Sequence, residues 1–222
     1  MKTTLRVIVL AAAVFLLLSL CACGNGENRP VVYDNVRHYA EYITAADDSD
    51  KWGMDEAIFP AELPTDATVE EFHMVYYDPW DAQWVTELVL RYDDAAAYDA
   101  EVGRLRAYPS TEYLGNYGVT GFAEGRDLLA MYADPYYGFV YAVTDGTGRI
   151  AYVELIFCNY FLDVDWTAWV EPEFLPVGFD ASSDNAYRHA KLEEEKGPTQ
   201  YSHFPSLCPA EDAIRDMLDG EN

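Results

Sequence analysis

The sequence predicts an α+β domain in which helices pack on one face of an antiparallel β-sheet. Two pairs of β-rich segments are each joined by a turn-forming sequence, which is typical of antiparallel hairpins. A capped amphipathic helix follows the first pair, so helices and strands alternate in blocks rather than in parallel βαβ units. The chain is 50% hydrophobic and 15% aromatic, which provides for a core despite a formal net charge of −25.

The first predicted hairpin spans residues 71–92. Alternating side chains from Glu71 to Tyr77 predict a strand, and Asp78-Pro79-Trp80-Asp81 predicts a turn. In the second strand, the residues predicted to share one face are Trp84, Thr86, Leu88, Leu90 and Tyr92, with Glu87 and Arg91 on the other.

A helix is predicted directly after this hairpin. Asp93 and Asp94 supply an N-cap and a negative charge near the helix N-terminus, where both are favourable. The apolar stripe consists of Tyr98, Val102 and Leu105, and the helix ends in a basic turn with Arg104 and Arg106 before Pro109.

The second predicted hairpin has strands at 137–144 and 150–161, joined by the glycine-rich loop 145–149 (DGTGR). Two shorter strands are expected before it, near 118–122 and 128–133.

The flanks of the sheet are predicted to be helical. Apolar residues at helical spacing predict a first helix near 33–45, and the loop 46–54 after it lacks ligands at two positions of a calcium-binding loop. Beyond Pro172, helices are expected near 184–196 and 209–219, the latter with the apolar face Ile214, Met217 and Leu218. We therefore expect a globular domain over residues 31–180 and a helical C-terminal appendage over 181–222.

The N-terminus has the pattern of an export signal. Lys2 and Arg6 precede fourteen uncharged residues, 7–20. A helix of that length reaches roughly 21 Å, which is short for a bilayer core of about 30 Å. The length suits the apolar region of a signal peptide instead.

Leu20-Cys21-Ala22-Cys23 follows this run and resembles the lipobox of bacterial lipoproteins, which has an aliphatic residue three positions before the modified cysteine and a small residue just before it. The resemblance implies that 1–22 is a removed signal peptide and that Cys23 carries a diacylglyceryl anchor in the cell envelope, outside the cytoplasm. Residues 23–30 would form the lipidated cysteine and a polar tether, whose last seven residues reach at most about 24 Å. An ordinary secretory signal and an uncleaved anchor are the alternatives.

The charge of the mature chain limits its partners. The leader holds two of the 14 basic residues and none of the 39 acidic ones, so the mature charge is 12 − 39 = −27. Such a surface repels nucleic acid and attracts cations, cationic peptides or a basic protein. Solubility alone is the other explanation of the charge.

Two aromatic–acidic segments, Asp78–Trp84 and Asp163–Trp169, are the candidate ligand site. Tryptophan rings beside carboxylates suit a glycan or a cationic ligand. The alternative is that the tryptophans close the ends of the core while the aspartates shape turns. The candidate binding residues are Trp80, Asp81, Trp84, Asp163, Asp165 and Trp166.

The sequence predicts no catalytic, metal or cofactor site. Asp163 and Asp165 on one strand would lie side by side, about 6.6 Å apart, whereas glycoside hydrolysis needs carboxylates on opposite sides of a bond. The four histidines share no ligand spacing, and no G-x-S-x-G or phosphate-binding glycine loop is present. A ligand- or partner-binding domain is therefore favoured, with an envelope hydrolase or carbohydrate-processing accessory as the alternative.

The mature chain also contains Cys158 and Cys208. Outside the cytoplasm these residues are permitted to form a disulfide, but the sequence equally allows two separate thiols.

Overall fold

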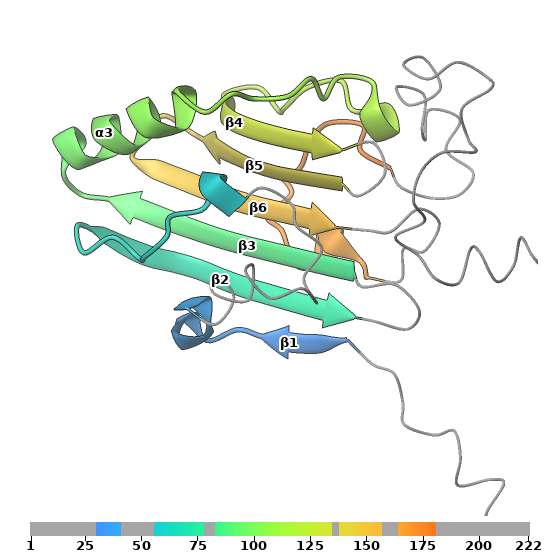
Figure 1. The fold of residues 1–222 in the computed structure, drawn as a ribbon, viewed down its shortest axis with the longest axis horizontal. Helices are drawn as coiled ribbons and strands as arrows, with labels where there is room; N and C mark the ends of the chain where they lie inside the picture. The colour runs from blue at the N-terminus through green and yellow to red at the C-terminus, as the bar shows by residue number, and fades with distance from the viewer. Residues whose placement is uncertain (1–29, 41–55, 78–82, 135–137, 157–163, 181–222) are drawn as a thin grey trace, which may run out of the picture.

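A computed structural model of the chain describes residues 30–40, 56–77, 83–134, 138–156 and 164–180. These residues form one six-stranded, fully antiparallel sheet in the order β1-β2-β3-β6-β5-β4, with a single α-helix (Figure 1). The fold is thus mostly sheet, and it confirms the antiparallel arrangement. The strands are β1 Val31–Tyr33, β2 Ala67–Tyr77, β3 Gln83–Tyr92, β4 Asp127–Asp134, β5 Gly138–Thr144 and β6 Arg149–Ile156.

Both predicted hairpins are present. β2 pairs with β3 along its whole length, with an irregularity between Val69 and Glu71. β5 pairs with β6, and their turn contains Gly146 and Gly148 at positive φ angles of 75° and 91°. A Cβ atom on Gly148 would lie 2.9 Å from the carbonyl oxygen of Tyr92, so this position requires glycine.

The helix α3 (Ala95–Arg106) covers one side of the sheet, here called the first face, which carries Leu88, Leu90 and Tyr152. The Asp94 side chain caps α3 by accepting a hydrogen bond of 2.8 Å from the Ala96 N–H. Leu105 is fully buried against this face, as the predicted apolar stripe requires. The short 3-10 helices η1 (Val36–His38) and η2 (Glu56–Ile58) belong to the same side.

The opposite side, here called the second face, carries Val85, Val89 and Tyr141 and is also buried. No α-helix covers it among the described residues. It is covered instead by residues around 117–119 and by residues 164–180, which we call the strap and which lie behind the sheet in Figure 1. The prediction of helices on one face is therefore confirmed only in part, because one helix covers the first face and irregular chain covers the second.

Two predicted elements differ from the structure. Residues 31–33, at the expected start of the first helix, form β1, because the β-branched valines there pair with the edge of β2. Residues 118–122 form no strand: they contain the end of the 3-10 helix η3 (Asn116–Gly118) and one isolated bridge at Gly121. Gly118 and Gly121 both adopt positive φ angles, which interrupts a regular strand.

Several predictions lie outside the described residues and stay predictions. They concern the loop 46–54, the turn 78–81, the end of the last strand, the helices near 184–196 and 209–219, and the signal peptide and tether. Within the described ranges, no helix is both long enough and apolar enough to cross a bilayer.

Packing of α3 can be tested with Leu105→Ala. Removing this fully buried side chain should lower the free energy of unfolding by about 2–5 kcal/mol, because it leaves a cavity between helix and sheet. The matched control is Leu114→Ala, at a side chain 44% exposed, which should change stability by less than about 0.5 kcal/mol. Urea unfolding measures both, and equal effects would contradict the packing described here.

Candidate functional site

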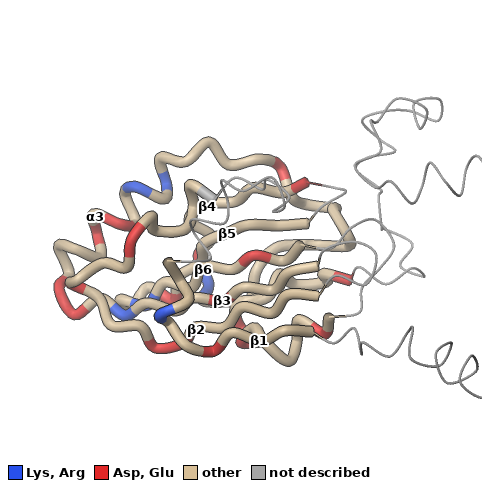
Figure 2. Tube along the Cα trace, turned by 60° about the horizontal axis from the view of Figure 1, so that its bottom comes forward, with Lys and Arg blue, Asp and Glu red and all other residues tan. Residues whose placement is uncertain are grey.

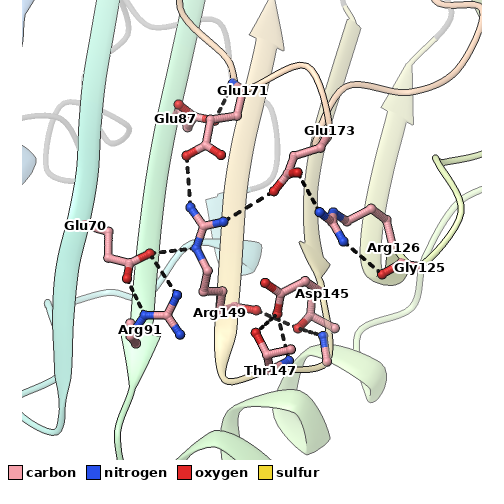
Figure 3. A network of polar contacts seen from close by, with 12 residues as sticks. Glu70, Glu87, Arg91, Gly125, Arg126, Asp145, Thr147, Arg149, Glu171 and Glu173 are labelled. Carbon is pink, nitrogen blue, oxygen red and sulfur yellow. Dashed lines mark hydrogen bonds and ion pairs between the residues drawn. The ribbon is translucent and has the colours of Figure 1, made fainter.

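A network of charged side chains lies on the second face, around Arg149 (Figure 3). Arg149 is the first residue of β6, and its side chain is only 16% exposed. Its guanidinium contacts three carboxylates: Glu70 at 2.6 Å, Glu171 at 2.9 Å and Glu173 at 3.3 Å. The contacts tie β6 to β2 and to the strap.

Two further arginines complete this network. Arg91 on β3 forms an ion pair with Glu70, and Arg126, just before β4, contacts Glu173 at 2.6 Å. Hydrogen bonding from Arg91 holds the pKa of Glu70 below its usual value. The guanidinium carbons of Arg126 and Arg149 lie 5.7 and 5.2 Å from the centre of the Phe174 ring, within cation–π range. Because each guanidinium already faces a carboxylate, the network presents no unpaired positive charge to an anionic ligand.

Glu87 lies beside this network and is nearly inaccessible, at 2% exposure. Its Oε1 atom accepts a hydrogen bond of 2.9 Å from the Glu171 backbone N–H. Burial raises the pKa of Glu87 to about 7, although this hydrogen bond and the charge of Arg149 lower it. Glu87 is therefore a carboxyl whose protonation changes near neutral pH, directly opposite His73 on β2.

A second buried carboxyl, Glu154, lies on the first face. It is fully buried, and the Thr86 hydroxyl donates to its Oε2 at 3.5 Å. Glu87 and Glu154 thus lie on opposite sides of the sheet and cannot flank one substrate bond.

The polar contacts of α3 hold chain segments in place. Arg104 donates to the carbonyl oxygens of Ala57 and Ile58, each at 2.8 Å, and pairs with Glu101 at 2.7 Å. Tyr152 also donates to Glu101 at 2.6 Å. Burial alone would raise the pKa of Glu101, but the bonds from Arg104 and Tyr152 outweigh burial and lower it.

The structure separates the two described tryptophans of the candidate ligand site. Trp84 is 6% exposed in the core of the first face, with its ring centre 5.0 Å from that of Tyr76. Trp166 packs on the second face against Phe179, with ring centres 4.9 Å apart. These two rings consequently share no common binding surface.

Asp165 has a local structural role. Its side chain caps the 3-10 helix η4 (Trp166–Ala168) by accepting bonds from the Thr167 N–H at 3.0 Å and hydroxyl at 2.6 Å. The two candidate segments nevertheless contact each other, because the Gln83 side chain accepts a hydrogen bond of 3.3 Å from the Val164 N–H. The other candidates, Trp80, Asp81, Asp163 and Cys23, lie outside the described residues, as do Cys158 and Cys208.

The network around Arg149 was not predicted from the sequence. One signal was available: Glu87 shares its side of β3 with Val85 and Val89, so the pattern itself indicates a carboxyl among apolar neighbours. Nothing in the sequence indicated the pairing of Arg149 with Glu171 and Glu173, which depends on how the strap folds back. Within the described ranges, no group of three or more His, Cys, Asp or Glu side chains is placed to hold a metal ion.

The titration of Glu87 should appear in the stability of the protein. The folded state keeps the Glu87 proton up to about pH 7, whereas the unfolded chain releases it near the ordinary value of 4.5. The contribution of Glu87 to the free energy of unfolding is therefore fully present below pH 4.5. It is lost as the pH rises through 7, and the total loss is about 3 kcal/mol. Glu87→Gln, which cannot ionise, should gain that amount relative to wild type between pH 4.5 and 8 in urea unfolding.

Glu101→Gln provides the opposite control. Because the pKa of Glu101 is lowered, its contribution is present above its unfolded pKa and is lost at acidic pH. The stability advantage of wild type over this variant should therefore shrink as the pH falls. Parallel pH profiles for wild type and Glu87→Gln would rule out a buried, titrating Glu87.

Comparison of the chain with protein-family models, curated proteins and solved structures found no match in any of the three. Its function is therefore inferred from its own residues and geometry.

Proposed function

We propose that this protein is a lipid-anchored lipoprotein of the cell envelope, whose sheet domain binds a basic partner outside the cytoplasm. The anchor proposal rests on the sequence Leu20-Cys21-Ala22-Cys23 after a short apolar run. The position of the domain is compatible with it, because β1 begins at Val31, eight residues after Cys23. Two acyl chains give stable membrane attachment where a single chain is marginal.

The distribution of charge carries the proposal of a basic partner. Arginines 91, 104, 106, 126 and 149 each form an ion pair with a carboxylate of the same chain. The charge of these five arginines is thus neutralised by ion pairs within the chain, while acidic positions are spread widely over the described trace (Figure 2). The remaining carboxylates make the surface attractive to a cationic peptide or a basic protein and unfavourable for nucleic acid.

The start of α3 is the part of this surface that we propose for the partner. Asp93, Asp94 and Asp99 are exposed there, and only Asp94 is used as a cap. The arginines of α3 lie in its last turn, where Arg104 pairs with Glu101 and Arg106 with Asp127. The first half of the helix therefore presents carboxylates without basic neighbours on α3.

Carbohydrate binding and hydrolysis have less support. Trp84 and Trp166 lie on opposite faces, and a glycan platform needs exposed rings on one side. Hydrolysis would need two accessible carboxyls across a bond, whereas Glu87 and Glu154 are buried on different faces. Because the candidates Trp80, Asp81 and Asp163 lie outside the described residues, carbohydrate binding and hydrolysis stay as alternative functions.

The anchor is tested with Cys23→Ser. This variant should accumulate as unprocessed precursor or be released from membranes, because the thioether cannot form. Membrane fractionation and the mass of the N-terminal peptide measure both results. The matched control, Cys21→Ser, should remain processed and membrane-bound; full cleavage and membrane binding of Cys23→Ser would exclude the lipid anchor at this residue.

The partner surface is tested with two charge reversals that change net charge equally. Asp99→Lys alters α3, and Glu124→Lys alters an exposed position between η3 and β4. Binding of the mature protein to a lysine-rich peptide is measured by titration at low salt and at about 1 M salt, where the Debye length falls to about 3 Å.

We expect Asp99→Lys to weaken binding several-fold more than Glu124→Lys, and we expect salt to weaken binding to all three proteins. Equal weakening by the two substitutions would mean that only net charge attracts the peptide, which is the behaviour of a merely soluble acidic protein. Absence of binding at low salt would exclude a basic partner for this surface.

A further inference from the structure

The segment from β1 to η1 differs in character from the rest of the described surface. Val31 and Val32 are 46% and 41% exposed, so both valines of β1 present apolar surface to solvent. Tyr33 follows them, and its ring lies 5.2 Å from that of His38. Arg37 donates from Nε to His38 at 3.2 Å, which makes Tyr33, His38 and Arg37 one contiguous group.

Arg37 is also unlike the other arginines that the structure describes. Arg91, Arg104, Arg106, Arg126 and Arg149 each face a carboxylate, whereas Arg37 forms no ion pair with any described acidic residue. Its side chain is exposed, so no residue in the described part of the chain prevents its charge from facing a partner outside the chain.

The β1–η1 segment does not share the strong negative charge of the whole protein. Residues 30–38 contain Arg37 and Asp34, which gives 1 − 1 = 0 with His38 neutral, in a chain of net charge −25. This neutral stretch with an exposed arginine begins eight positions after the proposed anchor at Cys23.

The two edge strands of the sheet, β1 and β4, differ in the hydrogen bonding of their outer backbone groups. The outer edge of β4 is covered by Ser110 and Thr111: the Thr111 N–H donates to Met131 at 2.9 Å, and the Ala133 N–H donates to the Thr111 hydroxyl at 2.6 Å. On the outer side of β1, no described residue forms a backbone hydrogen bond. With respect to the described residues, the β1 edge, at the bottom of the sheet in Figure 1, is thus open where the β4 edge is closed.

We infer that the β1 edge, through Val31, Val32, Tyr33 and Arg37, rests on the anionic surface of the bilayer that holds the lipid anchor. The inference depends on the proposed lipidation of Cys23. Val31 lies eight positions after Cys23, a span of at most about 29 Å, so the tether keeps this edge close to the bilayer. A contact too weak to bind by itself becomes populated when a tether supplies a high effective concentration.

The residue types match the chemistry of a lipid surface. Valine side chains suit the boundary between headgroups and acyl chains, and tyrosine is enriched at that depth. A single arginine near an anionic leaflet contributes roughly a fivefold preference for the bound orientation. The sheet then stands on its β1 edge, and β4, five strand spacings away, lies about 24 Å further from the membrane.

The orientation can be measured on the acylated mature protein in phosphatidylglycerol–phosphatidylcholine vesicles. Cys158→Ser and Cys208→Ser remove the other thiols, and the lipid occupies Cys23. A fluorophore is attached at Val32→Cys or, as the matched control, at Leu114→Cys, since the two side chains are similarly exposed at 41% and 44%. Quenching by a nitroxide on the lipid headgroups then reports the distance of each position from the bilayer.

We expect strong quenching at residue 32 and weak quenching at residue 114. Arg37→Glu should reduce quenching at residue 32, Arg37→Lys should retain it, and vesicles of phosphatidylcholine alone should give the result of Arg37→Glu. Equal quenching at both positions on vesicle-bound protein would overturn the orientation and leave the anchor standing. Protein that does not bind vesicles at all would instead overturn the proposed lipid anchor, and the orientation with it.

Discussion

The structure depends on one constraint: the central sheet is buried on both faces, but α3 covers only the first. The strap that covers the second face has no long helix or strand of its own, so its polar backbone groups need partners from the sheet. Three buried side chains supply them. Gln83 accepts from the Val164 N–H, Glu87 accepts from the Glu171 N–H, and Tyr141 donates to the Phe174 carbonyl oxygen at 2.9 Å.

These contacts explain why a carboxyl is kept in the core at position 87. Burial of the ionised Glu87 side chain is unfavourable, which is why its pKa is raised. An apolar residue at this position would, however, leave the Glu171 N–H without a hydrogen-bond acceptor. The adjacent pairs of Arg149 with Glu171 and Glu173 fix the same part of the strap. Burial of Val164, Val170 and Phe174 then adds more stabilisation than ionisation of one carboxyl removes, so loss of the Glu87 proton alone does not release the strap.

The sequence was sufficient for the elements whose signals are local. The hairpin turn at Gly146 and Gly148 and the cap at Asp94 both follow from neighbouring residues, and the structure has them where they were expected. The strap is different, because its position is determined by contacts between residues 22 to 84 apart, such as Arg149 with Glu171 and Glu171 with Glu87. Both sides of β3 are buried, which the sequence did not indicate. Glu87 and Arg91 share one side of the strand, and charged residues there are typical of a face exposed to solvent.

The separation of charges connects this architecture with a position at a membrane. The proposed removal of residues 1–22 would leave a charge of −27, which opposes the approach of the domain to an anionic bilayer within the screening length of about 8 Å. The repulsion is weakest where acidic residues are few and a cation is unpaired, and that part of the described surface is β1 and η1, the elements nearest the tether. Asp93 and Asp94 lie in the loop between β3 and α3, next to the end of β3 at Tyr92. β1 begins beside Tyr76, at the other end of the β2–β3 pair. If both proposals hold, this one arrangement lowers repulsion beside the anchor and leaves the acidic start of α3 accessible to a basic partner.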